Sequence, residues 1–460
     1  MSTAESSTPV PPRAAAPVTR GGLTIGQAWY AVAILTLANV SGAIDRQIFT
    51  SLVGPAKRDL GLTDTQVSLL MGFGFAVFFS IFGLAIGRMV DRRRRTTIVA
   101  VGAALWSVMT AVTGVARSYV QLLFARVGVG VGEATLSPAA VSIIGDAFPR
   151  GRLGTAMSFY MLGTFFGSGV SYALGAWIVS KADAPGLVTV PLVGAMYPWQ
   201  TVFFIIGLPG LLVTLLMLTV REPARTNSDG ALSTNVEPVP TSQVIAYLRA
   251  NARTMTALCL GFTCSASVTW GVGAWLQAFF VRTHGWSVAE AGALQGALTM
   301  GLGPVGTLLG GWLADRYAQR GVIDAPIRIG ILGALGMIVC AGLYPVVPSA
   351  TVAAALLVPV NLFAALPWGA ANSAIAQAMP SRMRGQGSAI FQLMVGLSGG
   401  IGPTAVALVT DRVFHDDAAL RWSLMSVTVV GMTLAAGILA WGRTAYRTTV
   451  MREYASNSQM

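Results

Sequence analysis

Long uncharged stretches alternate with short charged segments along almost the whole chain. Ten stretches contain no Asp, Glu, Lys or Arg; they cover residues 21–44, 66–87, 96–116, 153–180, 184–220, 254–281, 291–314, 329–381, 385–410 and 422–442. A transmembrane helix needs roughly 20 mostly apolar residues, and every stretch is long enough for one. The pattern therefore predicts a series of membrane-spanning helices rather than a soluble core.

Two places in this pattern add to the count of spans. The stretch 329–381 is long enough for two spans, which we expect to be separated near Tyr344 and Pro345. A further span is expected between Tyr119 and Asp146, although two charged residues interrupt it. Ten stretches, one of them double, and this additional span give twelve predicted transmembrane helices.

The polar segments divide the twelve spans into two sets of six. Residues 1–22 are rich in Ser, Thr, Pro and Ala, which predicts a disordered cytoplasmic tail. The polar segment 221–244 predicts a cytoplasmic linker between a bundle at 23–220 and a second bundle at 245–443, followed by a tail at 444–460. We therefore predict an all-α integral membrane protein built from two six-helix bundles.

Composition agrees with a membrane protein and argues against several other classes. The chain is 54% hydrophobic and only 10% charged, whereas soluble proteins carry about 25% charged residues. The three cysteines lie in apolar stretches, and His284 and His415 are too far apart in sequence to suggest a metal motif. The sequence has no phosphate-binding loop of the Walker type and no strand before its glycine-rich segment. We therefore expect no enzyme activity, no cofactor and no metal.

Basic residues are distributed very unevenly between the two sets of loops. With the N-terminus inside, 21 Lys and Arg residues fall in cytoplasmic segments and 7 in outer segments, while Arg46 and Arg126 lie within spans. Because cytoplasmic loops carry the excess of Lys and Arg, we expect both termini in the cytoplasm. The net charge of +12 then lies beside anionic lipid headgroups and requires no nucleic-acid partner.

A short motif occurs at the same place in both halves. The segment GRMVDRRRR follows the second predicted span, and GWLADRYAQR follows the eighth. An acid at a helix end, followed by arginines, can form ion pairs with a facing helix; alternatively, the arginines only anchor the inner side. The motif resembles the signature loop of the major facilitator superfamily, G-x-x-x-D-R-x-G-R-R, except that Arg94 replaces the second glycine. This resemblance implies two bundles that rock about a central cavity, and a cytoplasmic latch formed by Gly87, Asp91, Arg92, Asp315 and Arg316.

Four ionisable residues lie inside predicted spans, where charges are costly and usually functional. Asp45 and Arg46 are in the outer part of the first span, and Arg126 and Glu133 are seven residues apart in the fourth. Seven residues are about two helical turns, so the latter two project from one face. We expect a neutralised cluster whose pairing changes with conformation and which thereby takes up and releases a proton. The alternative is a static network that only holds the two helices together.

These same segments resemble the Spinster branch of the superfamily. The resemblance rests on I-D-R at the end of the first span, R-x-G-x-G-x-G-E-A in the fourth, and S-P-A-A…D-A-F-P-R-x-R after it. The branch includes lysophospholipid transporters and sphingosine-1-phosphate exporters in animals, and it has bacterial relatives. It implies that Asp45 and Arg46 form a proton-sensitive pair, with Arg126 and Glu133 as their partners in gating.

The second half carries almost no charge within its spans but does carry polar and aromatic groups. They are Thr269, Trp270, Trp275, Gln277, Gln295, Asn361, Trp368, Asn372 and Gln392. Each could simply pack or hydrogen-bond between helices. Together they predict an uncharged, partly aromatic wall facing a charged one. Such a cavity suits an amphiphile, with its head near Arg46 and Arg126 and its acyl tail along the second half.

We therefore expect a monomeric secondary transporter in the bacterial inner membrane. Its partners would be the lipid bilayer, protons and a lysolipid-like or sphingolipid-like amphiphile carried by alternating access. Arginines bind carboxylates and phosphates alike, so proton-driven multidrug efflux or transport of a small organic anion remains an alternative. An uncoupled lipid scramblase or a sensor would need the same cavity but no proton site.

Overall fold

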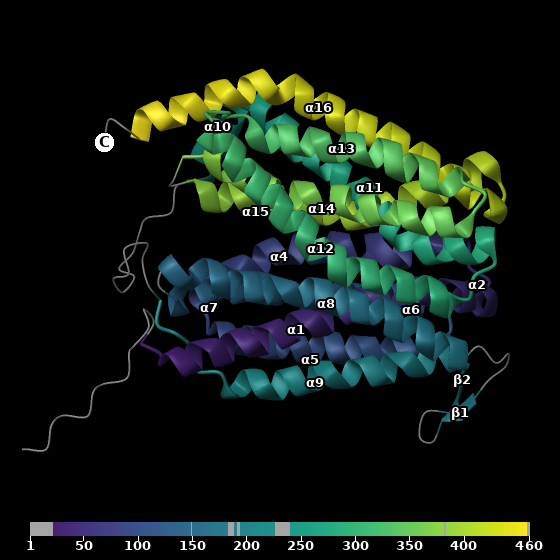
Figure 1. Cartoon of the computed structure of the whole chain (residues 1–460). Helices are drawn as coiled ribbons and strands as arrows, with labels where there is room; N and C mark the ends of the chain where they lie inside the picture. Colours follow the sequence, from purple (N-terminus) through teal and green to yellow (C-terminus); the bar gives the residue numbers. More distant parts are fainter. Residues whose placement is uncertain are drawn as a thin grey trace, which may run out of the picture.

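The computed structural model describes residues 22–148, 150–182, 188–190, 194–225, 240–380 and 383–457 (Figure 1). The described part is almost entirely helical. A small antiparallel sheet is the exception: β1 (Val188–Val190) pairs with β2 (Gly194–Met196), with Val188 opposite Met196. Nearly all of the predicted N-terminal tail and most of the predicted linker lie outside the described residues.

The first half of the chain forms one set of packed helices. Its elements are α1 (Ile25–Ser51), α2 (Val53–Leu60), α3 (Asp64–Ser68), the π-helix η1 (Leu69–Phe73), α4 (Gly74–Arg92), α5 (Arg95–Val115), α6 (Tyr119–Glu133), α7 (Leu136–Ala147), α8 (Arg150–Ala182), the 3-10 helix η2 (Pro198–Gln200) and α9 (Thr201–Thr219). In Figure 1 these helices make up the lower layer.

The second half forms the upper layer in Figure 1. Its elements are α10 (Thr241–Ala250), α11 (Ala252–His284), α12 (Val288–Gln319), α13 (Ala325–Leu343), the 3-10 helix η3 (Tyr344–Val346), α14 (Ala350–Ala378), α15 (Arg384–Leu408), the π-helix η4 (Val409–Phe414), the 3-10 helix η5 (Asp417–Ala419) and α16 (Leu420–Asn457). α16 continues as a helix well past residue 443, where the sixth span of this half was expected to end.

The predicted order of spans is found in the structure. Among the described residues, eleven helical segments are long and apolar enough to cross a membrane. The 33-residue helix α8 occupies the place of the fifth predicted span and completes the series of twelve. The break expected near Tyr344 is present, because α13 ends there and η3 separates it from α14. The fourth span, which was predicted as one helix, is divided into α6 and α7 directly after Glu133.

Short polar sequences fix where several helices begin. Thr24 precedes α1 and accepts a hydrogen bond from the backbone N–H of Gln27, whose side chain accepts one from the Thr24 N–H. Ser287 and Glu290 form the same reciprocal cap at the start of α12. Such capping boxes satisfy N–H groups that have no partner within the helix. They set the depth at which these two spans start.

The two halves meet along α8 and α12 and along α4 and α15. Glycines permit the closest approaches: a Cβ on Gly72 would overlap the backbone of Gly399, and one on Gly296 would lie 2.7 Å from the carbonyl oxygen of Gly169. We call the end of the molecule where α1 begins and α16 ends the terminal end. The opposite end, which carries α2 and the small sheet, is the α2 end (Figure 1).

Candidate functional site

Two ion pairs join α1 and α6 inside the first half. Asp45 and Arg46 are neighbours on α1, and Arg126 and Glu133 lie about two turns apart on α6. Arg46 pairs with Glu133. Arg126 Nη1 lies 3.5 Å from Asp45 Oδ1 and donates a hydrogen bond to the Asp45 carbonyl oxygen at 3.2 Å. The structure thus brings together the four charged residues predicted within spans, which we call the central charge cluster.

Burial separates one member of the central charge cluster from the other three. Asp45 and Arg126 are each 2% exposed and Glu133 is 1% exposed, whereas the Arg46 side chain is 23% exposed. Thr110 of α5 donates a hydrogen bond to the Asp45 carboxylate. The Arg126 guanidinium lies over the Phe49 ring, 4.9 Å from its centroid, which favours a desolvated cation. Arg46 is therefore the cluster charge most accessible to a solute.

The central charge cluster is not fully hydrogen-bonded within the described residues. Arg126 Nε and Nη2 and Glu133 Oε1 are buried and have no partner there. Because unpaired buried polar atoms are costly, such atoms usually mark a place where water or a ligand binds. The cluster therefore has spare donors and a spare acceptor beside its two pairs.

Small residues and a helix break allow this arrangement. A Cβ on Gly42 would lie 3.2 Å from Glu133 Oε2, so α1 must be narrow where Glu133 reaches Arg46. Directly after Glu133, α6 ends, and the Thr135 hydroxyl donates a hydrogen bond of 2.8 Å to the carbonyl oxygen of Gly132. Glu133 is thus the last residue of α6, at the point where the fourth span is interrupted. Sequence periodicity gave no sign of this break.

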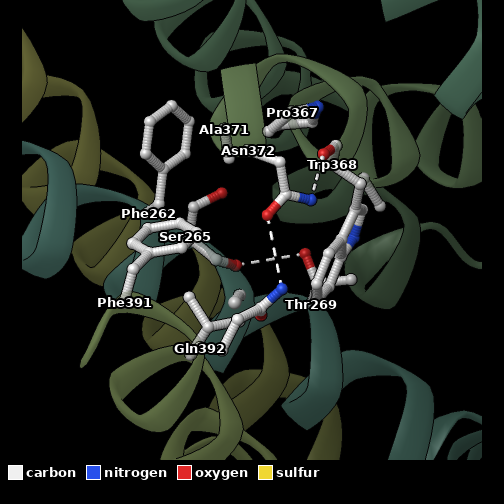
Figure 2. Close-up of a pocket in the computed structure, with 12 residues that line it drawn as sticks. Phe262, Ser265, Thr269, Pro367, Trp368, Ala371, Asn372, Phe391 and Gln392 are labelled. Atoms are coloured by element: carbon white, nitrogen blue, oxygen red, sulfur yellow. Dashed lines mark hydrogen bonds between the residues drawn. The ribbon is translucent and has the colours of Figure 1, made fainter. Parts of the chain in front are cut away.

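A small cavity, partly open to solvent, lies within the second half. It is lined by Phe262, Ser265, Ala266, Thr269, Ala364, Pro367, Trp368, Ala371, Asn372, Phe391, Gln392 and Val395. Figure 2 shows the amides of Asn372 and Gln392 meeting between the two phenylalanine rings on one side and Trp368 on the other. Gln392 Nε2 donates to Asn372 Oδ1 at 3.3 Å. The cavity, which we call the aromatic cavity, combines flat apolar walls with a small polar centre.

Four of the nine residues predicted for the substrate wall line the aromatic cavity, namely Thr269, Trp368, Asn372 and Gln392. The other five lie elsewhere. Three of them donate hydrogen bonds to backbone carbonyl oxygens: Trp275 to Pro403, Gln295 to Gly273 and Asn361 to Leu357. Trp270 packs against an apolar cluster, and Gln277 is buried.

Sequence reasoning missed Phe262, Ser265 and Phe391 as lining residues. Phe262, Ser265 and Thr269 are spaced by three and four residues, so they share one helix face with a predicted member. That spacing was the available signal for two of the missed residues.

The residues of the predicted latch lie where α4 and α12 end. Gly87 is half-buried in α4 and Arg92 is exposed at its last residue. Asp315 is exposed on α12, and the Arg316 guanidinium lies over the Trp312 ring, 5.4 Å from its centroid. The side chain of Asp91 lies outside the described residues. The latch therefore remains a prediction.

A buried arginine ties several helix ends together at the terminal end. Arg95, the first residue of α5, is fully buried and pairs with Asp146 of α7 and with Glu222 beyond α9, the latter at 3.0 Å. Its Nη2 donates to the carbonyl oxygen of Pro223 at 2.6 Å. Burial raises the pKa of Glu222, but the hydrogen bonds and charge of Arg95 outweigh it and hold that pKa below its usual value. In the sequence, Arg95 was only one of many inner arginines.

Comparisons with known proteins agree with this architecture. A family profile described as Major Facilitator Superfamily matches residues 35–403. The chain is 27% identical over 444 residues to a protein named MFS-type efflux pump from Mycolicibacterium smegmatis, covering 93% of this chain and 95% of the relative. It is 25% identical over 430 residues to a probable L-galactonate transporter of Escherichia coli, covering 89% of this chain and 88% of that protein. Among solved structures, a bacterial homologue of the human lysosomal transporter Spinster, described as inward-facing and unoccupied, matches with a TM-score of 0.72 and 25% identity over 93% of this chain and 98% of that chain.

Proposed function

The chain belongs to the Major Facilitator Superfamily, and on that premise we propose that it is a proton-coupled transporter of a lysolipid-like or sphingolipid-like amphiphile. The two halves would alternate between exposing a central cavity at one end and at the other. The observation that carries the proposal is the central charge cluster, because two buried acids paired with two arginines are costly in a membrane unless they serve a function.

Proton coupling is assigned to Asp45. Its carboxylate is buried between the Thr110 hydroxyl and the Arg126 guanidinium, which is 3.5 Å away. Protonation would remove the negative charge that Arg126 faces and leave that guanidinium with donors to spare. Arg126 would then draw on another anion, either Glu133 or the substrate. Proton binding and anion binding would thus be linked through one arginine.

We assign the substrate to the space between the central charge cluster of the first half and the aromatic cavity of the second half. Arg46, partly exposed, would bind the phosphate or carboxylate of the head, since a guanidinium donates two parallel hydrogen bonds to either. The aromatic cavity of the second half would receive the apolar part beside Phe262, Phe391 and Trp368. The likeness to a solved Spinster homologue supports a transporter of the Spinster type, the branch whose resemblance implies an amphiphilic substrate.

The orientation proposed here follows the distribution of basic residues. The terminal end would face the cytoplasm and the α2 end the outer side of a bacterial inner membrane. With the α2 end bridged by ion pairs between the halves, this arrangement corresponds to an inward-facing form, the form described for the similar Spinster homologue. We propose a monomer, since each half already packs against the other.

A second candidate is transport of a small organic anion. The relative named as a probable L-galactonate transporter is nearly as similar in sequence as the efflux pump and is covered over most of its length. A polyhydroxy acid would also suit the site, with its carboxylate on Arg46 and its hydroxyls on Asn372 and Gln392.

The test uses the purified protein in proteoliposomes with an imposed pH gradient. We expect gradient-stimulated movement of a fluorescent lysophospholipid that Asp45→Asn abolishes and Asp59→Asn, an acid outside the central charge cluster, retains. Movement of galactonate instead of lysophospholipid would favour the second candidate. Lysophospholipid movement that is the same at every pH, and in Asp45→Asn, would indicate an uncoupled scramblase and overturn the proton site.

A further inference from the structure

Charged residues from both halves meet at the α2 end in one connected network. Asp64, fully buried at the start of α3, accepts hydrogen bonds from both terminal nitrogens of Arg282 on α11, at 2.7 and 2.9 Å. Lys57 of α2 donates to Asp64 at 2.9 Å and to Asp417 of η5 at 2.5 Å. Asp411 of η4 accepts from the backbone N–H and the hydroxyl of Thr65, at 2.8 and 2.6 Å.

Nearly every link in this network crosses from one half to the other. Lys57, Asp64 and Thr65 belong to the first half, and Arg282, Asp411 and Asp417 to the second; the link between Lys57 and Asp64 alone lies within one half. In the sequence, Lys57 and Arg282 are merely two of the seven basic residues in outer segments.

The two-pronged contact between Asp64 and Arg282 is the strongest part of the network. Bidentate guanidinium–carboxylate pairs are geometrically specific and are weakened by small displacements. This one is shielded from water, because Asp64 is fully buried and the Arg282 guanidinium also lies over the Trp275 ring, 5.5 Å from its centroid. Separation of the halves by a few ångströms at this end would break it.

After separation, Asp64 and Arg282 would each still have an oppositely charged residue nearby within its own half. Asp64 would keep Lys57, its neighbour in the first half. Arg282 is paired with Asp64, and Asp411 and Asp417 of the second half each place a carboxylate oxygen within 4.8 Å of one of Asp64, so both acids lie beside this arginine. Opening would therefore exchange partners rather than leave buried charges unpaired, so it would avoid most of the penalty of breaking a buried ion pair.

We propose that Lys57, Asp64, Arg282, Asp411 and Asp417 form a partner-exchanging gate at the α2 end. In the closed form the pairs cross between the halves, and in the open form each half pairs its own charges. The gate rests on the alternating access proposed above but not on the identity of the substrate or on proton coupling. Asp64 is its hub, because it joins Lys57 of its own half to Arg282 of the other.

The experiment measures the separation of the halves at this end in the full-length protein. Spin labels are placed on cysteines at Val120 in the first half and Ala418 in the second, both exposed, in a background without Cys259, Cys264 and Cys340. Pulsed electron–electron distance measurements in nanodiscs then give the proportions of closed and open forms. A neutralised residue in the gate is compared with the same kind of change outside it.

We expect Asp64→Asn and Arg282→Gln each to raise the ratio of open to closed form by about tenfold or more. Asp417→Asn, a change at a half-exposed residue that should not disturb folding, should raise it less, because Lys57 retains Asp64. Asp59→Asn and Arg117→Gln, charge removals at the same end within the first half, should leave the ratio unchanged.

Two results would overturn the gate. If pH or solutes shift the distances but Asp64→Asn and Arg282→Gln do not, the halves move without this gate, and alternating access stands. If every variant and condition gives one short distance, the halves do not separate at the α2 end, and both the gate and alternating access fail.

Discussion

The Arg46–Glu133 pair tests how the burial of a charged side chain determines its contribution to the free energy of unfolding. Removing one partner of a buried pair typically costs about 3–5 kcal/mol, because the other charge is left unpaired. Here the two partners differ in burial: the Glu133 side chain is 1% exposed and that of Arg46 is 23% exposed. The cost should therefore depend on which partner is removed.

We expect Arg46→Met to lower the free energy of unfolding by about 3 kcal/mol, because it leaves the carboxylate of Glu133 buried and unpaired. Glu133→Gln should cost only about 1–2 kcal/mol, because the arginine that remains can turn toward water. The double variant should cost less than the sum of the two, since it leaves neither charge behind. A coupling energy of about 2 kcal/mol would follow from the double-mutant cycle.

The assay is equilibrium unfolding of the purified protein in mixed micelles titrated with SDS, followed by the fluorescence of its 11 tryptophans. Arg117→Met, at an exposed arginine outside both the central charge cluster and the gate, serves as the control for loss of one basic residue. Equal costs for the two single variants would refute the argument from burial. A double variant whose cost equals the sum would show that the two side chains do not interact energetically.

Three further outcomes are expected. Glu222→Gln should destabilise the protein at neutral pH, and the difference in stability between this variant and wild type should shrink as the pH falls below about 4.5. The reason is that an acid with a lowered pKa stabilises the fold only while it is ionised. Thermal unfolding across pH 3–7 measures this difference. Trp368→Ala should weaken substrate binding several-fold, measured by competition in the transport assay, and an unchanged apparent KM would remove the aromatic cavity from the substrate path. Gly72→Val should force the halves apart where η1, which carries Gly72, lies against Gly399 of α15, and should raise the proportion of long Val120–Ala418 distances. An unchanged distribution would show that this contact does not hold the closed form.

The number and order of the spans could be predicted because each depends on local composition. A stretch such as 96–116 must be buried in lipid or protein whatever its neighbours are, so the sequence alone identifies it as a span. The central charge cluster was predictable for a related reason. A residue such as Arg126 is so costly in an apolar helix that its partners are expected to be the few other charges within spans.

Contacts that depend on the packing of distant segments could not be predicted in this way. Asp64 and Arg282 are each unremarkable in a polar segment at the end of a span, and only the packed halves bring them within 2.7 Å of each other. The same holds for Trp275, which by composition could line a cavity but is turned toward the Pro403 carbonyl oxygen. Helix periodicity gives the face of one helix, whereas the neighbour of that face is set by tertiary packing.

The two charged networks differ in a way that constrains how a proton could drive transport. Both pairs of the central charge cluster join α1 to α6, so they lie within one half, and a rigid rocking of the halves leaves them intact. In the part of the chain that the structure describes, the ion pairs Lys57–Asp417 and Asp64–Arg282 cross between the halves, and both are in the gate at the α2 end. A proton on Asp45 therefore acts on closure only if the first half itself deforms.

The structure offers one route for this coupling, since α1 leads directly into α2, which carries Lys57. It also offers one weak point, the break after Glu133 that separates α6 from α7. If this reasoning holds, Asp45→Asn should change the Val120–Ala418 distances, whereas the same variant with its gate already opened by Asp64→Asn should show no further change.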